Sequence, residues 1–370
     1  MENKLLLAII VGTRPEIIKL SEVIKNTKKL FNTYLIHTGQ NYDYELNDIF
    51  YDDLSIDKPD YYLNCSKENI GLSIGDIISK SYNLFLQIKP NAILILGDTN
   101  SCLCSYSAKR LKIPIFHMEA GNRCFDKNVP EEINRKIIDN IADINICYTL
   151  HAKLNLLKEG FSQKYIFICG SPMYEILNKI KYKIHTSSIL NDLKLNNNDF
   201  FLFSFHREEN IDNDFVFNQI IDCIYNMSIY YDKKIVISTH PRTMKKINDK
   251  NIKFNSNVIL SKPFGLINYI NLEINAICTI SDSGSITEES NILKFKAILL
   301  RSSTERPEGI DEGSILISNT KWKNLNEAIQ YSILKDNNRL NISEYYNNNN
   351  VSDIICNLIL SYTNIINFHK

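Results

Sequence analysis

Residues 5–20 read LLLAIIVGTRPEIIKL, an apolar run that leads through a glycine directly into the start of a helix. The run at 5–11 has the length of a strand that is buried on both faces, as strands of parallel sheets are. Thr13 and Glu16 have the spacing of a capping box, and Pro15 suits the first position of a helix. One face of that helix is apolar: Ile17, Leu20 and Ile24. This stretch therefore predicts a strand, a tight turn and a helix, the repeating unit of α/β folds.

The same alternation recurs along the chain. Five further apolar runs between helical patterns complete a first half: 34–37, 92–96, 115–118, 144–147 and 166–168. Six more runs form a second half: 200–204, 235–238, 258–260, 276–280, 297–300 and 314–317. At 370 residues the chain is longer than one hydrophobic core usually supports. We therefore expect two Rossmann-like, doubly wound α/β domains, one after the other.

Polar, Asn-rich segments indicate where the domains end. A connection of this kind spans 179–199, and we place the domain boundary near Ser171. A second Asn tract at 347–350 precedes an apolar helix pattern, which we expect to pack back on the first domain. The prediction is thus a first domain of residues 1–170, completed by a helix at 352–370, and a second domain of residues 171–351.

Charge and cysteine content exclude several classes of protein. Lys plus Arg and Asp plus Glu are balanced at 42 each, so no excess charge attracts nucleic acid or an anionic membrane. The nine cysteines include no C-x-x-C pair, which argues against a zinc site and a disulfide framework. The run at 5–11 makes a poor signal peptide, and no run approaches the roughly 20 apolar residues of a membrane span. We expect a soluble, cytoplasmic protein that binds any anion through local groups.

Charged residues just beyond strand ends are candidate site residues, because ligands of open α/β sheets bind there. Arg14 lies at the N-terminus of the first helix, a position that favours an anion site. Lys19 lies about one turn on, and a simple place in a well-capped helix is an equally open interpretation for it. Three carboxylates follow later turns: Asp98, Glu119 and Glu131. Each could instead be a helix cap or a solvated surface acid. Their convergence on one edge favours a role in proton transfer.

Three basic residues follow strand ends in the second half: His206, His240 and Arg242. A histidine in such a position can contact phosphate or transfer a proton near neutral pH. A structural role is an equally open interpretation for each of the three.

The segment SDSGSITEES at 281–290 gives a sharper signal. Ser283 and Gly284 form a turn whose backbone N–H groups can bind phosphate, and Ser285 with Glu288 again has capping-box spacing. Arg306 follows the run at 297–300 and is a candidate clamp. Neither a Walker lysine nor a G-x-G-x-x-G motif accompanies the turn, so an ATPase or a nicotinamide site is not indicated. We expect a nucleotide diphosphate held by the second domain, with its reactive end at the acids of the first and the active site in the interdomain cleft.

Taken in order, several motifs resemble those of the non-hydrolysing UDP-N-acetylglucosamine 2-epimerase family. They are VGTRPE with Lys19, HTGQNYD, GDTNS, HMEAG followed by PEEINR, HREEN, SDSGSITEE and TERPEG, and they span about residues 5–320. The resemblance implies a glycosyltransferase-B-like pair of Rossmann domains and a UDP-sugar substrate. It also implies a homodimer, with no metal and no redox cofactor.

The resemblance carries roles to individual positions. The family's catalytic carboxylates match Asp98, Glu119 and Glu131, and its other functional positions match Arg14, Lys19 and His206. Its diphosphate and ribose contacts match Ser283, Gly284 and Glu289, and the arginine of its TERPE motif matches Arg306. Two departures stand out: Gly284-Ser285 replaces the usual glycine pair, and Gln40-Asn41 replaces a Gln-His pair linked to activation by a second substrate molecule.

A narrower resemblance concerns the substrate. HMEAGNRCFDKNVPEEINRK at 117–136, with KPFG at 262–265, is similar to the branch that converts UDP-2-acetamido-2,6-dideoxy-L-talose to UDP-N-acetyl-L-fucosamine, a precursor of capsules and O-antigens. An apolar residue such as Phe125 would suit the methyl group of a 6-deoxy sugar. Epimerisation of UDP-N-acetylglucosamine to UDP-N-acetylmannosamine is the alternative. More distant alternatives are a hydrolysing 2-epimerase, a glycosyltransferase of the same fold and a non-catalytic nucleotide-sugar-binding protein.

Overall fold

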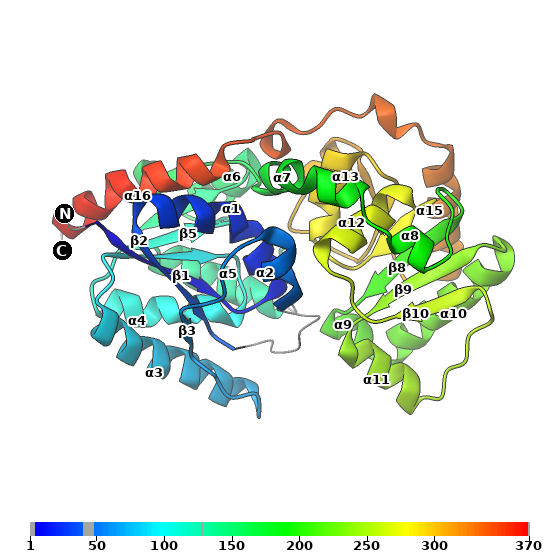
Figure 1. Ribbon diagram of the computed structural model, residues 1–370, viewed down its shortest axis with the longest axis horizontal. Coiled ribbons are helices and arrows are strands. Elements are labelled where there is room, and N and C mark those ends of the chain that lie inside the picture. Colours follow the sequence, from blue (N-terminus) through cyan, green and yellow to red (C-terminus); the bar gives the residue numbers. More distant parts are fainter. Residues whose placement is uncertain (1–3, 40–47, 127–128, 369–370) are drawn as a thin grey trace. The chain divides into compact units, whose positions relative to one another are not determined.

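The computed structural model describes residues 4–39, 48–126 and 129–368. The chain divides into two compact units, residues 1–179 with 344–370, and residues 180–343. In each unit, helices flank a sheet whose strands all run parallel (Figure 1), which confirms the predicted α/β class. Within the described ranges no helix is both long and apolar enough to cross a membrane.

Unit 1 contains a seven-stranded sheet in the order β3-β2-β1-β4-β5-β6-β7. Its strands are β1 (Leu6–Val11), β2 (Asn32–His37), β3 (Tyr61–Tyr62), β4 (Ala92–Leu96), β5 (Ile115–Met118), β6 (Ile144–Cys147) and β7 (Ile166–Ile168). Its helices are α1 (Arg14–Leu30), α2 (Asp48–Leu54), α3 (Ile70–Ile88), η2 (Asn100–Leu103), α4 (Cys104–Arg110), α5 (Pro130–Ile141), α6 (Leu150–Lys158), η3 (Gln163–Tyr165), most of α7 (Met173–His185), η5 (Glu344–Tyr346) and α16 (Val351–Phe368). The chain first winds outward from β1 to β3 and then from β4 to β7, so the direction of winding reverses between β1 and β4.

Unit 2 contains a six-stranded sheet in the order β10-β9-β8-β11-β12-β13. Its strands are β8 (Phe200–Phe205), β9 (Lys234–Thr239), β10 (Val258–Ser261), β11 (Thr279–Ser281), β12 (Ala297–Leu300) and β13 (Ile315–Ser318). Its helices are α8 (Ile189–Asp192), α9 (Glu208–Ile211), α10 (Asp214–Tyr230), α11 (Pro241–Asp249), α12 (Leu266–Asn275), α13 (Ser285–Leu293), α14 (Glu308–Asp311), α15 (Trp322–Leu334) and η4 (Asn337–Arg339). Here the winding reverses between β8 and β11.

All twelve predicted apolar runs contain strands of the two sheets. The run predicted at 276–280 becomes a strand only from Thr279, because α12 continues to Asn275. The two-residue edge strand β3 was not predicted, since Tyr61 and Tyr62 are too few to form a recognisable run.

Helix α16, near the C-terminus, packs back on the N-terminal part of unit 1. It packs beside α1 (Figure 1), and Asn26 of α1 donates a hydrogen bond of 2.8 Å to the Ser352 hydroxyl. Glu175 of α7 accepts a hydrogen bond of 2.9 Å from the Ser352 backbone N–H and a second one from its hydroxyl. These contacts hold the first turns of α7 in unit 1. The division between the units therefore falls between residues 179 and 180, whereas the sequence predicted it near Ser171.

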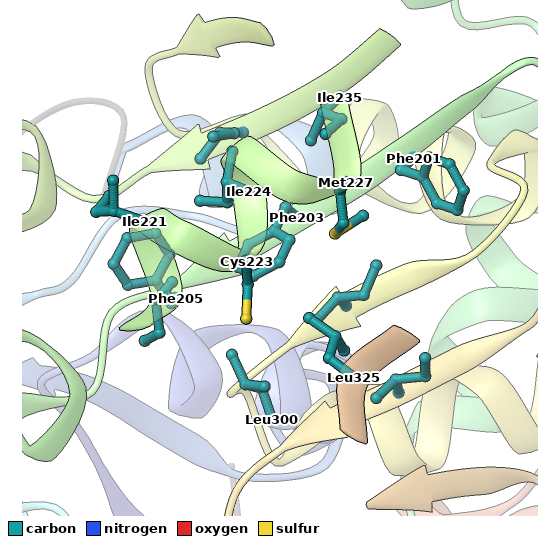
Figure 2. Close-up of a cluster of buried hydrophobic side chains, with 14 of the residues drawn as sticks. Phe201, Phe203, Phe205, Ile221, Cys223, Ile224, Met227, Ile235, Leu300 and Leu325 are labelled. Carbon is teal, nitrogen blue, oxygen red and sulfur yellow. The ribbon is translucent and has the colours of Figure 1, made fainter. Parts of the chain in front are cut away.

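The core of unit 2 explains why its central strand is so apolar. Phe201, Phe203 and Phe205 point from β8 into a cluster that includes Ile224 and Met227 of α10 (Figure 2). Alternate residues on the opposite face, Phe200 and Leu202, enter a second buried cluster with Leu272. Strand β8 is thus buried on both faces. The polar residue His206 follows directly after it, at the carboxyl edge of the sheet.

Candidate functional site

Unit 1 brings charged residues together at the point where its winding reverses. Strand β4 pairs with β1 on one side and β5 on the other, with Leu96 opposite Met118. The turns after these strands carry Arg14, Asp98 and Glu119, and the backbone N–H of Gly97 donates a hydrogen bond of 3.0 Å to the Met118 carbonyl. Ligands of open α/β sheets bind at such reversals.

Glu119 forms an ion pair with Lys19. The Nζ atom of Lys19 lies 3.0 Å from Oε2 of Glu119, and the lysine is only 3% exposed. The same Nζ lies 5.2 Å from the centre of the Tyr148 ring, which favours a cation. Asn122 donates a hydrogen bond of 3.3 Å to the other Glu119 oxygen. Glu119 has φ of 66°, a left-handed conformation that is uncommon outside glycine and typical of functional sites.

Asp98 is held by Arg135, which sequence reasoning did not select. Nε of Arg135 lies 2.6 Å from Oδ2 of Asp98, and NH1 lies 2.8 Å from Oε2 of Glu132. Burial acts to raise the pKa of Glu132, but the Cys124 N–H and Arg135 outweigh it, so the pKa lies below its usual value. The available signal was the spacing of Glu132 and Arg135, three residues apart on one helix face.

The remaining unit 1 candidates are more accessible. Glu131 occupies the first turn of α5 and is half-buried, and its side chain has no hydrogen bond or ion pair to the residues that the structure describes. Arg14 is the first residue of α1, so Pro15 takes the second helical position where we expected the first. The Arg14 guanidinium lies 5.9 Å from the centre of the Phe50 ring.

Glu16 does more than cap its own helix. Its Oε2 accepts hydrogen bonds of 2.7 Å from both the Gly12 and the Thr13 backbone N–H, while Oε1 accepts one of 2.5 Å from the Thr99 hydroxyl. Glu16 therefore ties the turn that carries Arg14 to the turn that carries Asp98. Burial raises its pKa to about 7, against the hydrogen bonds that favour the charged form.

In unit 2 the winding reversal places His206 beside Asp282. His206 follows β8, Asp282 follows β11, and these two strands pair with Ser204 opposite Ser281. Nδ1 of His206 lies 3.1 Å from Oδ1 of Asp282. Asp282 was missed, although its position directly after a strand is the signal that selected Asp98.

The turn at 283–284 opens α13 as expected, but its side chains pair differently. Gly284 is the N-cap residue, so the predicted capping box of Ser285 and Glu288 is wrong. The Ser285 hydroxyl instead donates a hydrogen bond of 3.2 Å to Oε2 of Glu289 and lies 3.0 Å from the Ser283 hydroxyl.

Glu288 instead pairs with Arg306, whose Nε lies 2.9 Å from Oε1 of the acid. Arg306 also pairs with Glu305. A Cβ atom at Gly284 would crowd the ends of the Arg306 and Glu305 side chains. The absence of a side chain at Gly284 therefore lets both charged groups lie close to this turn.

His240 and Arg242 lie at the start of α11. The His240 ring centre is 6.3 Å from that of His206, so these two candidates are neighbours. Arg242 is directed to the surface, where it forms ion pairs of 2.7 Å with Glu208 and 2.9 Å with Asp212. Its contact with a diphosphate stays a prediction.

Two further predictions concern the pair Gln40-Asn41 and the binding of a metal ion. The pair Gln40-Asn41 lies outside the described residues. In the part of the chain that is described, no group of three or more His, Cys, Asp or Glu side chains is arranged to hold a metal ion.

Comparison with known proteins identifies the family to which the sequence is similar. A family model described as UDP-N-acetylglucosamine 2-epimerase matches residues 24–360. The chain is similar to the structure of UDP-N-acetylglucosamine 2-epimerase from Rickettsia bellii, with a TM-score of 0.91, 42% identity and 98% of each chain covered. A Methanocaldococcus jannaschii UDP-GlcNAc 2-epimerase in complex with UDP-GlcNAc and UDP also has a TM-score of 0.91, with 34% identity over 97% of this chain and 100% of that one.

Relatives of another specificity are also similar. The UDP-2,3-diacetamido-2,3-dideoxy-D-glucuronate 2-epimerase of Pseudomonas aeruginosa is 32% identical over 82% of this chain and 86% of its own length.

Proposed function

The chain belongs to the UDP-N-acetylglucosamine 2-epimerase family of isomerases, and from that premise we propose that it inverts C2 of a UDP-2-acetamido sugar. The observation that carries the proposal is the pairing of β4 with β5 in unit 1. It puts Asp98 and Glu119 on neighbouring turns, and each acid is paired with a different cation.

The reaction must break a C–H bond that no adjacent carbonyl activates. Elimination of UDP across C1 and C2 meets this need. A base takes the C2 proton, the electrons form a C1–C2 double bond, and UDP leaves with the electron pair of the C1–O bond. The resulting 2-acetamidoglycal then takes UDP back at C1 and a proton on the opposite face of C2. One group must therefore accept a proton and another must return one, which accounts for several acids.

We assign the proton transfers at C2 to Asp98, Glu119 and Glu131. Lys19 and Arg135 hold Glu119 and Asp98 in fixed positions through their ion pairs. Arg14 and Lys19 supply positive charge for the developing negative charge on the leaving group, together with His206.

The UDP moiety is assigned to unit 2. The turn that opens α13 offers the backbone N–H of Gly284 and the hydroxyl of Ser283, whose own N–H donates a hydrogen bond of 3.1 Å to the Ser281 hydroxyl. Arg306 adds a cation beside the same turn. Glu289 accepts a hydrogen bond from Ser285 and is well placed within this cluster to meet ribose hydroxyls. His240 and Arg242 extend the basic surface toward the phosphates.

For the sugar we propose UDP-2-acetamido-2,6-dideoxy-L-talose, converted to UDP-N-acetyl-L-fucosamine for capsule or O-antigen synthesis. Support comes from residues 122–126, where the Phe125 side chain is 78% exposed on the loop before α5 and could cover an apolar methyl group. UDP-N-acetylglucosamine is the second candidate, because both solved relatives above carry that substrate in their names. The ratio of kcat/KM for the two substrates decides between them.

We further propose a homodimer formed through α3 and α4. Exposed apolar residues gather on these helices: Ile70, Leu72, Tyr82, Leu86 and Tyr106. Tyr82 and Tyr106 line the same surface depression with Arg110. A second copy of the chain would cover this face.

Proton NMR of the purified protein with each UDP-sugar tests the proposed activity. Appearance of the C2 epimer, still attached to UDP, is the expected result. Release of free sugar would indicate a hydrolysing epimerase, and transfer to an added acceptor would indicate a glycosyltransferase. Broadening of the UDP-sugar signals without any new species would indicate a protein that binds nucleotide sugars but does not convert them.

A further inference from the structure

Asp282 is a buried acid with an unusual set of partners. Its side chain is fully buried, and a carboxylate in that position needs donors to offset the loss of water. Oδ2 accepts three hydrogen bonds: 2.9 Å from the His206 N–H, 3.0 Å from the Arg207 N–H and 2.9 Å from the Asn210 side chain. Oδ1 lies 3.1 Å from Nδ1 of the His206 ring and also accepts a hydrogen bond of 3.1 Å from the His206 N–H, which both oxygens share.

All these donors come from one short segment, residues 206–210, which follows β8. The segment is held against β11 because the Asp282 N–H donates a hydrogen bond of 3.3 Å to the Ser204 carbonyl. Burial acts to raise the pKa of Asp282, but His206, Arg207 and Asn210 outweigh it and hold the pKa well below its usual value. The carboxylate is therefore charged at neutral pH, so its Oδ1 atom can accept a hydrogen bond but cannot donate one.

This contact favours one tautomer of the His206 ring. A carboxylate oxygen can only accept, so Nδ1 is the ring nitrogen suited to donate to Oδ1, and Nε2 is the nitrogen left for a ligand. The ring is partly accessible, with 32% of its side chain exposed. When a diphosphate approaches Nε2, an imidazolium donates from both nitrogens, to Asp282 on one side and to a phosphate oxygen on the other.

We infer that Asp282 is a positioning residue that reserves Nε2 of His206 for the diphosphate and lets the ring carry positive charge there. The inference rests on the proposed function for the identity of the ligand. It extends that function, because it explains how a histidine in unit 2 could stabilise the negative charge on departing UDP.

A purely structural role is the competing explanation, since Asp282 also anchors the backbone of residues 206–207. The substitution Asp282→Asn separates the two. A carbonyl oxygen in the place of Oδ2 keeps the three donors of that side. The amide NH2 takes the place of Oδ1, gives up that oxygen's share of the His206 N–H and donates to Nδ1. The ring must then accept at Nδ1, which places its proton on Nε2 and disfavours the charged form.

The test is the ¹⁵N NMR spectrum of the His206 ring, with UDP itself as the probe. In the native protein we expect a protonated Nδ1 without ligand and two protonated nitrogens with UDP bound. In Asp282→Asn we expect a neutral ring protonated at Nε2 in both states, UDP affinity weaker by about tenfold, and kcat lower by about 10²-fold. Asn210→Ala removes a donor to Oδ2 without touching the ring contact, so it should keep the native ring state.

The outcomes are distinct. An unprotonated Nδ1 in the native protein overturns the inference without any variant. So does an Asp282→Asn protein that keeps the native ring state and UDP affinity. If the native protein shows the expected ring states but epimerises no UDP-sugar, the proposed function fails while the role of Asp282 stands.

Discussion

Nζ of Lys19 and Oε2 of Glu119 lie 3.0 Å apart, and both side chains are buried at the carboxyl edge of the unit 1 sheet. Burying two charges is costly unless they remain paired. The pair therefore ties the stability of unit 1 to the geometry of its proposed site.

Lys19→Met should destabilise unit 1, because Glu119 loses the charge that offsets its burial. We expect a loss of about 3 kcal/mol in the free energy of unfolding, measured with urea. The double variant with Glu119→Gln should recover part of it. Lys28→Met is the control, since its pair with Asp57 is exposed and worth at most about 1 kcal/mol. Equal losses from the two lysine variants would contradict this account.

Glu16 should make stability depend on pH. Its pKa in the folded protein, about 7, lies above the ordinary value of 4.5, so folding binds its proton more tightly than the unfolded chain does. The stabilisation from Glu16 is fully present below pH 4.5 and is lost as the pH rises through 7. Glu16→Gln can keep the same hydrogen-bond partners without titrating.

The free energy of unfolding of Glu16→Gln relative to the native protein should therefore rise by about 3 kcal/mol between acidic and alkaline pH. Denaturation with urea across this range measures it. Parallel pH curves for the two proteins would show that Glu16 does not titrate in this range.

Gly284→Ala should weaken UDP binding, because the new methyl group would push the ends of the Arg306 and Glu305 side chains away from the turn. Calorimetry should show at least about a tenfold loss of affinity, equivalent to about 1.4 kcal/mol. Gly75→Ala is the matched control: it lies within α3, and nothing is within 4 Å of its added Cβ. If the two alanine variants bind UDP equally well, Arg306 and this turn do not form the diphosphate site.

The apolar face of α3 and α4 should hold the dimer together. Leu86→Glu combined with Tyr106→Glu places charges on it, so sedimentation velocity should show a monomer where the native protein shows a dimer. Leu360→Glu on α16 is the control, since this leucine is 58% exposed but lies on another helix. A native monomer, or a dimer that survives both changes, would place the interface elsewhere.

The fold could be predicted largely from periodicity. Buried strands such as β1 and β8 are continuous apolar runs, and Pro130 begins α5 as the sequence indicates. The strand-end rule also located Asp98, Glu119 and His206, because parallel strands present their carboxyl ends on one edge.

Pairings between distant residues were beyond the same reasoning. Arg135 reaches Asp98, and Asp282 reaches His206, across 37 and 76 residues of sequence. Spacing along one helix or turn cannot predict such contacts. The expected capping box at Ser285 failed because the helix begins one residue earlier, with Gly284 as N-cap, and Glu288 pairs with Arg306 farther along the chain.

The central claim is that Asp98, Glu119 and Glu131 transfer protons at C2 of a UDP-sugar, and turnover in D₂O tests it most directly. The product should carry deuterium at C2. Glu119→Gln and Glu131→Gln should lower kcat by about 10²-fold or more, with UDP affinity changed far less. Glu22→Gln, a buried acid of α1 paired with Lys25, should behave as the native protein does. Product without deuterium at C2, or Gln variants at positions 119 and 131 that keep kcat while UDP affinity collapses, would contradict the claim.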